Sequence, residues 1–280
     1  MDVADLVRAE SLGAEDGATP PAVFLRDGDA FVATALAGGP WSPDAQHGGA
    51  VCGLLGRSLE VCPTPVPMRI VRVTFELMRP VPLAALRVAT EVLRSGKRTQ
   101  LARASLLHGE VEVARGTALW LRVATGLGLE GAPNLAEEEP LPFPPGRGAS
   151  PLIRVPNLPG YLRAVDFVRA DGEPTGRGPS TVWIRSRVPL VEGEPLTPFA
   201  RLAAACDFTS GVANALDFAR FVSINPDVTL HVERAPQGEW IAVHGTTSVR
   251  TDGTGFSHAR LFDERGRVAT ASASLFVDAR

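Results

Sequence analysis

The chain is 280 residues long, which allows one large domain or two domains of ordinary size. Its 45% hydrophobic and 21% charged residues are typical of a globular protein with a real core. The net charge of −3 gives no reason to expect a nucleic-acid partner, because proteins that bind nucleic acid usually present a basic face.

Three further observations predict a cytoplasmic protein with no membrane partner. The N-terminal segment 1–17 is acidic and lacks the continuous apolar core of a signal peptide. No segment approaches the roughly 20 apolar residues of a membrane-spanning helix. Cys52, Cys62 and Cys206 form neither a CxxC pair nor an even framework, so we expect no disulfide and no bound zinc.

The first half reads as a strand, a helix and then a run of strands. The helix is predicted over 47–62, HGGAVCGLLGRSLEVC, where apolar residues recur at helical spacing and small residues surround them. Such a helix is apolar on most sides, so we expect it to be enclosed by the sheet. The strands are predicted over 30–36, 74–79, 86–95, 100–108 and 116–121.

Residues 124–160 are rich in proline and acidic residues, which predicts a linker without regular structure. After it, the second half repeats the order of the first. A helix is predicted over 198–216, PFARLAAACDFTSGVANAL, and the strands over 180–188, 229–234, 240–250, 256–263 and 271–277. The sequence TDGTG between two of these strands is a hairpin signal.

An offset of 155 residues relates the two halves. TFELMR at 74–79 matches TLHVER at 229–234, and Val113-Ala114 matches Val268-Ala269. We therefore predict an α+β fold with two tandem repeats, a double hotdog in which an antiparallel sheet wraps a central helix in each repeat. The expected divisions are an N-terminal repeat at 1–123, a linker at 124–160 and a C-terminal repeat at 161–280. A single unrepeated α+β domain is the alternative.

The sequence resembles the TesB-like (type II) acyl-CoA thioesterases. The resemblance rests on FVSINPDVTLHVERAPQGEW at 221–240, on GRVATASASLFV at 266–277 and on His47-Gly48-Gly49, taken in this order along the chain. It extends over residues 23 to 278 apart from the linker. It implies a double hotdog that hydrolyses acyl-CoA to a free acid and CoA, that needs no cofactor, and that assembles as a homodimer or homotetramer.

The resemblance also implies which residues catalyse the reaction. In this family three polar side chains of the second half activate a water molecule, and they are an aspartate, a threonine or serine, and a glutamine. Asp207 matches the aspartate. Asn225 occupies the hydroxyl position, with Ser223 as the alternative. Ala273 occupies the glutamine position, so the sequence departs from the family there.

The residues themselves can support this chemistry. We expect Asp207, near the start of an otherwise apolar helix, to orient and deprotonate water, and Asn225 to hold that water. An N-cap-like role for Asp207, or an ion pair with Arg201 or Arg234, is the alternative. His47, Gly48 and Gly49 open the first helix, where free N–H groups favour a developing negative charge.

When GGAVCG of the first helix is aligned with CDFTSG of the second, Gly49 lies opposite Asp207, so the first half offers backbone donors and the second half polar side chains. This asymmetry predicts one active site per chain, at the boundary of the halves, with His47, Gly48, Gly49 and Ser223 as substrate-binding residues. The remaining histidines lie in strand patterns and are predicted to be structural: His108, His231, His244 and His258.

Other classes of site fit the sequence less well. It contains no clustered metal ligands, no GxSxG elbow and no phosphate-binding glycine loop. A hydratase or dehydratase of the same fold would carry D-x-N-x-x-H, but the residue five positions after Asp207 is Val212. A non-catalytic acyl-CoA binder is the other alternative, and Ala273 favours it.

Overall fold

The computed structural model describes residues 20–132, 160–172, 178–217 and 219–280. The first half contains β1 (Phe24–Asp27), β2 (Ala30–Ala33), η1 (Ala35–Ala37), α2 (Gly48–Glu60), β3 (Met68–Glu76), β4 (Ala85–Arg94), β5 (Thr99–His108) and β6 (Val111–Arg122). The second half contains η2 (Gly160–Arg163), β7 (Val165–Asp171), β8 (Ser180–Ser186), α3 (Pro198–Cys206), η3 (Asp207–Thr209), β9 (Phe221–Ile224), β10 (Asp227–Val232), β11 (Ile241–Val249), β12 (Thr254–Asp263) and β13 (Gly266–Ala279).

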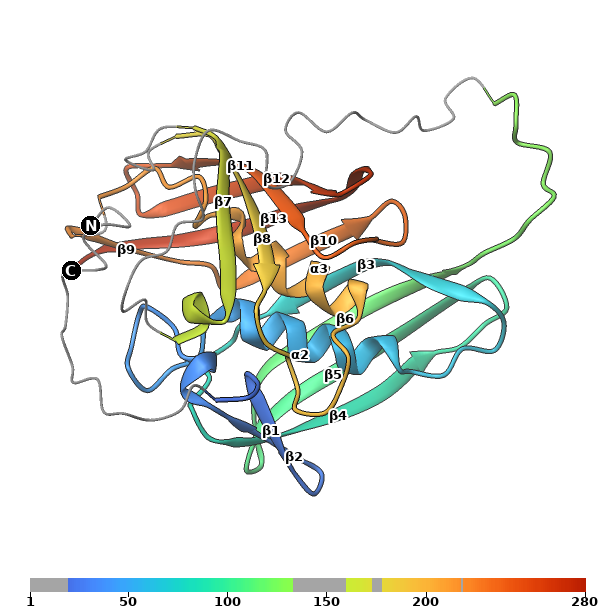
Figure 1. The fold of residues 1–280 in the computed structure, drawn as a ribbon, viewed down its shortest axis with the longest axis horizontal. Coiled ribbons are helices and arrows are strands. Elements are labelled where there is room, and N and C mark those ends of the chain that lie inside the picture. Colours follow the sequence, from blue (N-terminus) through green and yellow to red (C-terminus); the bar gives the residue numbers. More distant parts are fainter. Residues whose placement is uncertain (1–19, 133–159, 173–177, 218) are drawn as a thin grey trace.

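The strands form one continuous antiparallel sheet, and its two halves follow corresponding strand orders outward from the centre (Figure 1). The order is β1-β2-β4-β5-β6-β3-β10-β13-β12-β11-β8-β7, with β9 paired to β13. The halves meet where β3 pairs with β10, and there Thr74 lies directly opposite Thr229. Their hydroxyl oxygens are 3.1 Å apart, and the two residues are separated by 155 positions. The residues that revealed the repeat in sequence therefore lie at its axis of pseudo-symmetry.

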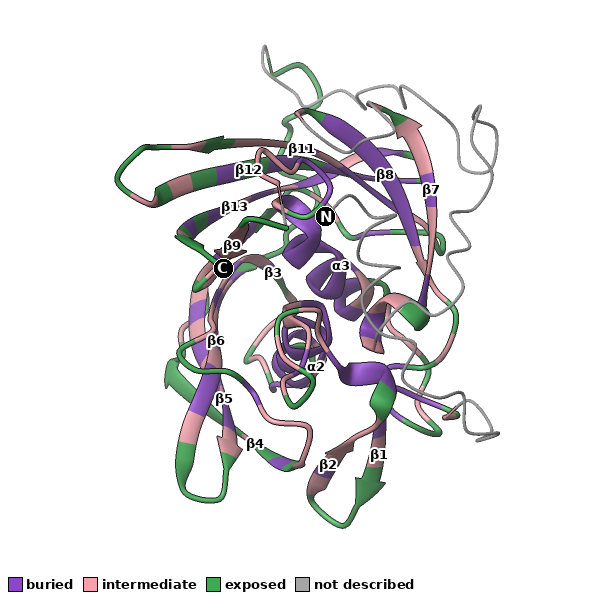
Figure 2. Cartoon of the chain, turned by 90° about the vertical axis from the view of Figure 1, so that its left-hand side faces the viewer, coloured by how far each residue is buried: buried purple, intermediate pink, exposed green. Residues whose placement is uncertain are grey.

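The fold is an α+β double hotdog, as predicted. The 155-residue offset carries the bounds of β5, Thr99–His108, onto those of β12, Thr254–Asp263. Each half places its helix against the concave side of its own part of the sheet, and α2 and α3 lie beside each other between the two halves of the sheet (Figure 2). The predicted enclosure of the helices is also confirmed, because nearly every residue of α2 from Gly49 to Leu59 is buried.

Several predicted boundaries are wrong. The strand predicted over 74–79 lies further toward the N-terminus, because Pro80 and Pro82 follow and proline cannot continue a central strand. The strand predicted over 30–36 ends at Ala33 and gives way to η1. The helix predicted over 198–216 ends at Cys206, where the hydroxyl of Thr209 donates to the carbonyl of Cys206 at 2.6 Å and the chain tightens into η3.

The predicted linker lies mostly outside the described residues. Residues 124–132 contain no helix or strand, residues 133–159 are not described, and η2 begins at Gly160. The domain divisions at 123 and 160 stay a prediction. No helix in the described parts of the chain is long and apolar enough to cross a membrane.

Candidate functional site

The start of α2 lies against the end of α3 because small residues line the contact between the helices. A Cβ atom added to Gly56 would lie 2.6 Å from the Cβ of Ala203, and one added to Gly53 would lie 3.2 Å from the Cβ of Ala204. Larger side chains at these positions would separate the helices. The close approach brings His47 and Gly48, from the first half, to Asp207 of the second half.

Asp207 is the C-cap residue of α3 and the first residue of η3. The expectation that it lies near the start of a helix is wrong, because the helix stops at Cys206. Its side chain is only 5% exposed and faces the first turn of α2. A Cβ atom on Gly48 would lie 2.7 Å from the Asp207 Cγ, so only glycine fits beside this carboxylate.

Two polar side chains contact the carboxylate of Asp207. The Asn225 side-chain amide, at the end of β9, donates from Nδ2 to Asp207 Oδ1 at 2.8 Å. His47 places Nδ1 3.1 Å from Asp207 Oδ2. The structure therefore brings together residues from both halves of the sequence, as expected for a single site at their boundary.

The Nδ1 atom of His47 lies near both the Gly49 N–H and Asp207 Oδ2, and it can form a hydrogen bond with only one of them at a time. As the N-cap of α2 it accepts a hydrogen bond from the Gly49 N–H at 2.9 Å, and this requires a free lone pair on Nδ1. Donation to Asp207 Oδ2 would instead require a proton on Nδ1. We assign the N-cap bond to the resting state, because its N–H is aligned with the nitrogen, whereas only the distance supports a bond to Asp207.

The alternative partners expected for Asp207 are wrong. Arg234 pairs through both of its terminal nitrogens with Asp263, at 2.5 Å each. Arg201 donates to the carbonyl oxygens of Leu196 and Gly238. The carboxylate of Asp207 thus faces an amide and an imidazole, which leave it able to accept a proton from a bound molecule.

Aromatic rings cover the site on one side, and no motif in the sequence indicates them. The ring centroids of Tyr161 and Phe208 lie 5.3 Å and 5.0 Å from that of His47. Burial raises the pKa of the Tyr161 hydroxyl well above its ordinary value, and the charge of Asp207 raises it further, so the phenol stays protonated. Tyr161 follows the predicted linker, and its one distinction in sequence is that it is the chain's single tyrosine.

Comparison with protein families gives two matches that together span most of the chain. Residues 37–121 match the acyl-CoA thioesterase N-terminal domain, and residues 133–277 match the acyl-CoA thioesterase C-terminal domain. The chain belongs to the acyl-CoA thioesterase family. The match in each half agrees with the internal repeat, and the order of the two domains is the order in which their motifs occur in the sequence.

Solved structures share the fold of this family member at low sequence identity. A candidate thioesterase II from Thermobifida fusca is 18% identical, covers 92% of this chain and 96% of its own, and has a TM-score of 0.69. A hot dog fold protein from Alicyclobacillus acidocaldarius is 14% identical, covers 92% of this chain and 96% of its own, and has a TM-score of 0.70. An acyl-CoA thioesterase II from Mycobacterium marinum is 17% identical, covers 83% of this chain and 89% of its own, and has a TM-score of 0.62. Comparison with curated protein sequences gave no significant match.

Ala273 is the position to which the family resemblance assigns a glutamine, and it lies inside the fold. Ala273 is 2% exposed and faces the helices, while Ser274 on the same strand is exposed on the other face. The alternation confirms that the serines flanking Ala273 point away from it. The cross-strand neighbour of Ala273 on β12 is Ser257, whose buried hydroxyl has no hydrogen-bond partner among the described residues.

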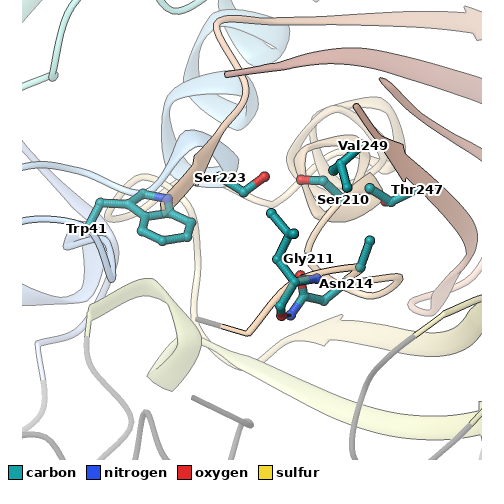
Figure 3. A pocket seen from close by; sticks show the side chains of 9 residues that line it. Trp41, Ser210, Gly211, Asn214, Ser223, Thr247 and Val249 are labelled. Carbon is teal, nitrogen blue, oxygen red and sulfur yellow. Dashed lines mark hydrogen bonds between the residues drawn. The ribbon is translucent and has the colours of Figure 1, made fainter. Parts of the chain in front are cut away.

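Ser223 is not a partner of Asp207 in this structure. It lines a hollow beside the site instead, together with Trp41, Ser210, Asn214 and Thr247 (Figure 3). Asn225, two residues further on, is the one that reaches the carboxylate. The two residues that the family resemblance offered for one position therefore occupy different places.

The remaining histidines are sheet residues, as predicted. His244 shares a hydrogen bond with Thr181 at 2.7 Å, and His258 shares one with Thr246 at 2.9 Å. His108 and His231 are exposed strand residues. Within the described ranges, no three histidine, cysteine or acidic side chains lie close enough to hold a metal ion. Cys52, Cys62 and Cys206 are buried free thiols.

Proposed function

We propose that this chain hydrolyses acyl-CoA thioesters to a free acid and CoA, with Asp207 as the general base for water. Membership of the acyl-CoA thioesterase family supports the reaction class. The hydrogen bond from Asn225 to Asp207 is the observation that supports these two residues as the catalytic pair, because it orients a buried carboxylate where the two halves meet.

The proposed step begins with a water molecule on Asp207 Oδ2, the carboxylate oxygen that Asn225 does not occupy. As the water oxygen attacks the thioester carbonyl carbon, its proton passes to Asp207 and the carbonyl oxygen becomes an oxyanion. Collapse of the tetrahedral intermediate breaks the carbon–sulfur bond. The proton held by Asp207 then passes to the thiolate of CoA, which restores the carboxylate.

Backbone N–H groups at the start of α2 are the proposed oxyanion donors. The Gly48 N–H donates to no other described residue, and it lies at the N-terminus of a 13-residue helix whose dipole favours negative charge. The Gly49 N–H is held by His47 Nδ1 in the resting state. A proton on His47 Nδ1 would free this second donor, so His47 links the charge at Asp207 to the donors of α2.

A non-catalytic acyl-CoA binder is the second candidate, and Ala273 is the observation that favours it. This position carries no side chain that could hold water, although the family resemblance assigns a glutamine to it. The hydratase alternative has less support, because Val212, at the position of the required histidine, is a buried residue without acid–base chemistry.

The experiment that separates the candidates measures thiol release and binding on the same substrates. Release of CoA with saturation kinetics supports hydrolysis. Saturable binding without release would identify a binder, and hydration of an enoyl-CoA without thiol release would identify a hydratase.

We also propose that the protein forms a homo-oligomer. At one end of the described sheet, an edge of β7 pairs with no described strand, and an exposed strand edge can pair with another chain. The native mass from light scattering tests this proposal, and a monomer at micromolar concentration would contradict it.

A further inference from the structure

Two consecutive carbonyl groups of the first half hold His47 and Tyr161 side by side. The Ala37 carbonyl accepts a hydrogen bond from the His47 N–H at 2.8 Å, and the Gly38 carbonyl accepts one from the Tyr161 N–H at 2.7 Å. Gly160 makes this approach possible, because its φ is 48° and a Cβ atom there would overlap the Gly38 carbonyl oxygen. The backbone that carries Tyr161 is therefore anchored to the first half, beside His47.

The ring of Tyr161 packs onto the first turn of α2. A Cβ atom on Gly49 would lie 2.8 Å from Tyr161 Cε1 and 3.1 Å from His47 Nδ1, so any larger residue would displace the ring. Cε1 is bonded to the ring carbon that carries the hydroxyl. The hydroxyl-bearing side of Tyr161 therefore lies at the start of α2, where the proposed oxyanion donors lie.

Neighbouring aromatic rings restrict how the Tyr161 ring can turn. Its centroid lies 5.3 Å from that of His47 and 6.2 Å from that of Phe208, and the planes of the tyrosine and phenylalanine rings differ by 26°. Tyr161 as a whole is only 3% exposed. A buried ring that is packed in this way keeps its hydroxyl in one place.

The Tyr161 hydroxyl has no partner within the described parts of the chain. It forms no hydrogen bond with another described residue, although a buried tyrosine hydroxyl usually finds one. Burial and the charge of Asp207 raise the pKa of the hydroxyl, so it stays protonated and can donate. A protonated, unpartnered hydroxyl close enough to be affected by the charge of Asp207 indicates that an acceptor oxygen binds here from outside the chain.

The start of α2 offers one free backbone donor to such an oxygen in the resting state. The Gly48 N–H donates to no other described residue, whereas the Gly49 N–H is held by His47 Nδ1 at 2.9 Å. An oxyanion is generally stabilised by more than one donor. The hydroxyl of Tyr161 lies beside these N–H groups and is available without any change in the bond between His47 and Gly49.

We propose that the Tyr161 hydroxyl is the second oxyanion donor, which binds the carbonyl oxygen of the thioester and stabilises the negative charge that develops on it. The inference rests on the proposed thioester hydrolysis at Asp207. Tyr161 keeps its proton throughout and contributes a hydrogen bond only. The proton transfers between water, Asp207 and the thiolate of CoA are therefore unchanged.

The variant Tyr161→Phe removes the hydroxyl and keeps the ring. We expect kcat for CoA release to fall by about a hundredfold, the usual effect of losing one oxyanion donor, with little change in the melting temperature. Ser58→Ala is the matched control, because it removes a buried hydroxyl of α2 that bonds within its own helix, to the Leu54 carbonyl at 2.8 Å. The control should keep the wild-type kcat. Wild-type kcat in Tyr161→Phe would overturn the inference.

A carbonyl probe separates hydrogen bonding from packing. The probe is a ketone analogue of acyl-CoA in which a methylene group replaces the thioester sulfur, so the carbonyl is kept and cannot be hydrolysed. A hydrogen bond lowers the infrared stretching frequency of this carbonyl. We expect the bound carbonyl to absorb at higher frequency in Tyr161→Phe and at the wild-type frequency in Ser58→Ala. A lower kcat with an unchanged frequency would show that Tyr161 acts by packing alone, which would overturn the inference.

The hydroxyl can also be probed without a variant, because the chain contains one tyrosine. Protein produced with 3-fluorotyrosine carries fluorine beside the hydroxyl at position 161 and nowhere else. We expect its fluorine resonance to shift when the ketone analogue binds. If Tyr161→Phe does not fold, this measurement decides, and an unshifted resonance at saturation would overturn the inference.

The outcomes separate this inference from the proposed function. Loss of activity in Asp207→Asn with full activity in Tyr161→Phe would leave hydrolysis intact and overturn the inference. Absence of CoA release from the wild type would overturn the proposed function, and the carbonyl frequency of the bound analogue would still report the contact with Tyr161. Equal frequencies in wild type and Tyr161→Phe would then overturn the inference as well, and an analogue that does not bind would overturn both.

Discussion

The Asn225 side-chain amide donates to Asp207 Oδ1 at 2.8 Å, which joins the end of a short strand to the end of a buried helix. This bond takes one oxygen of the carboxylate and leaves Oδ2 facing His47 at 3.1 Å. An amide can orient a carboxylate without giving it a proton, so Asp207 retains its capacity as a base. At the position to which the family resemblance assigns a hydroxyl, this chain thus carries an amide that contacts the aspartate.

Substitution of Asn225 tests this orientation. Asn225→Ala removes a hydrogen bond to a charged group, so we expect kcat to fall by about tenfold to a hundredfold. Asn225→Asp should be more damaging, because two carboxylates in contact cannot both stay ionised and one of them takes up a proton. Steady-state thiol release measures both variants. An Asn225→Asp protein with wild-type kcat would show that the contact has no role in catalysis.

Gly48→Ala tests the close approach between α2 and Asp207. The added methyl group would lie 2.7 Å from Asp207 Cγ, so the carboxylate must move, and we expect kcat to fall by at least about tenfold. The helix itself should not suffer, because alanine has the higher helix propensity.

Gly53→Ala is the matched control for the Gly48 variant. Its methyl group would meet the Cβ of Ala204 at 3.2 Å, one turn further along the same interface and away from Asp207. We expect Gly53→Ala to lower the melting temperature while it lowers kcat less than Gly48→Ala does. If both variants lose activity and thermal stability in parallel, the effect of Gly48→Ala is one of packing alone.

The carboxyl group of Asp263 should make the stability of the folded protein depend on pH. Its side chain is fully buried against Arg234. Burial by itself raises the pKa of Asp263, but hydrogen bonds from Arg234 and from two backbone N–H groups outweigh it and hold the pKa below its ordinary value. Such a carboxyl stabilises the fold above its unfolded-state pKa of about 3.9, and the contribution is lost as the pH falls through the lower folded-state value.

The variant Asp263→Asn isolates this contribution. We expect the free energy of unfolding at pH 7 to fall by about 2 kcal/mol, the typical cost of losing hydrogen bonds to a charged group. The difference from wild type should shrink as the pH falls below about 4, where the carboxyl of the unfolded wild type takes up a proton, and it should be lost once the pH passes the lower folded-state pKa. Urea unfolding at several pH values measures it. A difference that is the same at pH 3 and pH 7 would contradict the assignment.

The hydrogen bond between Thr74 and Thr229 makes a prediction about the junction of the two repeats. Their hydroxyl oxygens are 3.1 Å apart, and the two strands pair directly around them. In a double-mutant cycle with Thr74→Val and Thr229→Val, we expect a coupling energy of about 0.5–1 kcal/mol in unfolding. Additive effects of the two substitutions would show that the bond contributes nothing to joining the repeats.

The internal repeat made the fold predictable from the sequence. Alternation with period two located the strands, and a constant offset of 155 residues aligned them, so β5 and β12 can be matched from the residues alone. Where local patterns conflicted with tertiary structure, the predictions failed. The helix was expected to continue after Cys206, yet the Thr209 hydroxyl donates to the Cys206 carbonyl and the helix ends there.

The candidate site was only partly predictable. Asp207, Asn225 and Gly48 lie in recognisable motifs, and the structure brings them together. Tyr161 could not be found in this way, because what distinguishes it is burial and distance across the fold. A tyrosine that follows a linker has no feature in the sequence that reveals an unpartnered hydroxyl.

The proposed role of Asp207 as the base that activates water is tested most directly by one comparison of variants. CoA release and acyl-CoA binding are measured for the wild type, for Asp207→Asn, and for Asp227→Asn as a control. Asp227 is the first residue of β10, and its side chain accepts a hydrogen bond from the Ser274 N–H. We predict that Asp207→Asn lowers kcat by at least about a hundredfold with binding retained, while the control keeps its activity. Wild-type release by Asp207→Asn would contradict the account.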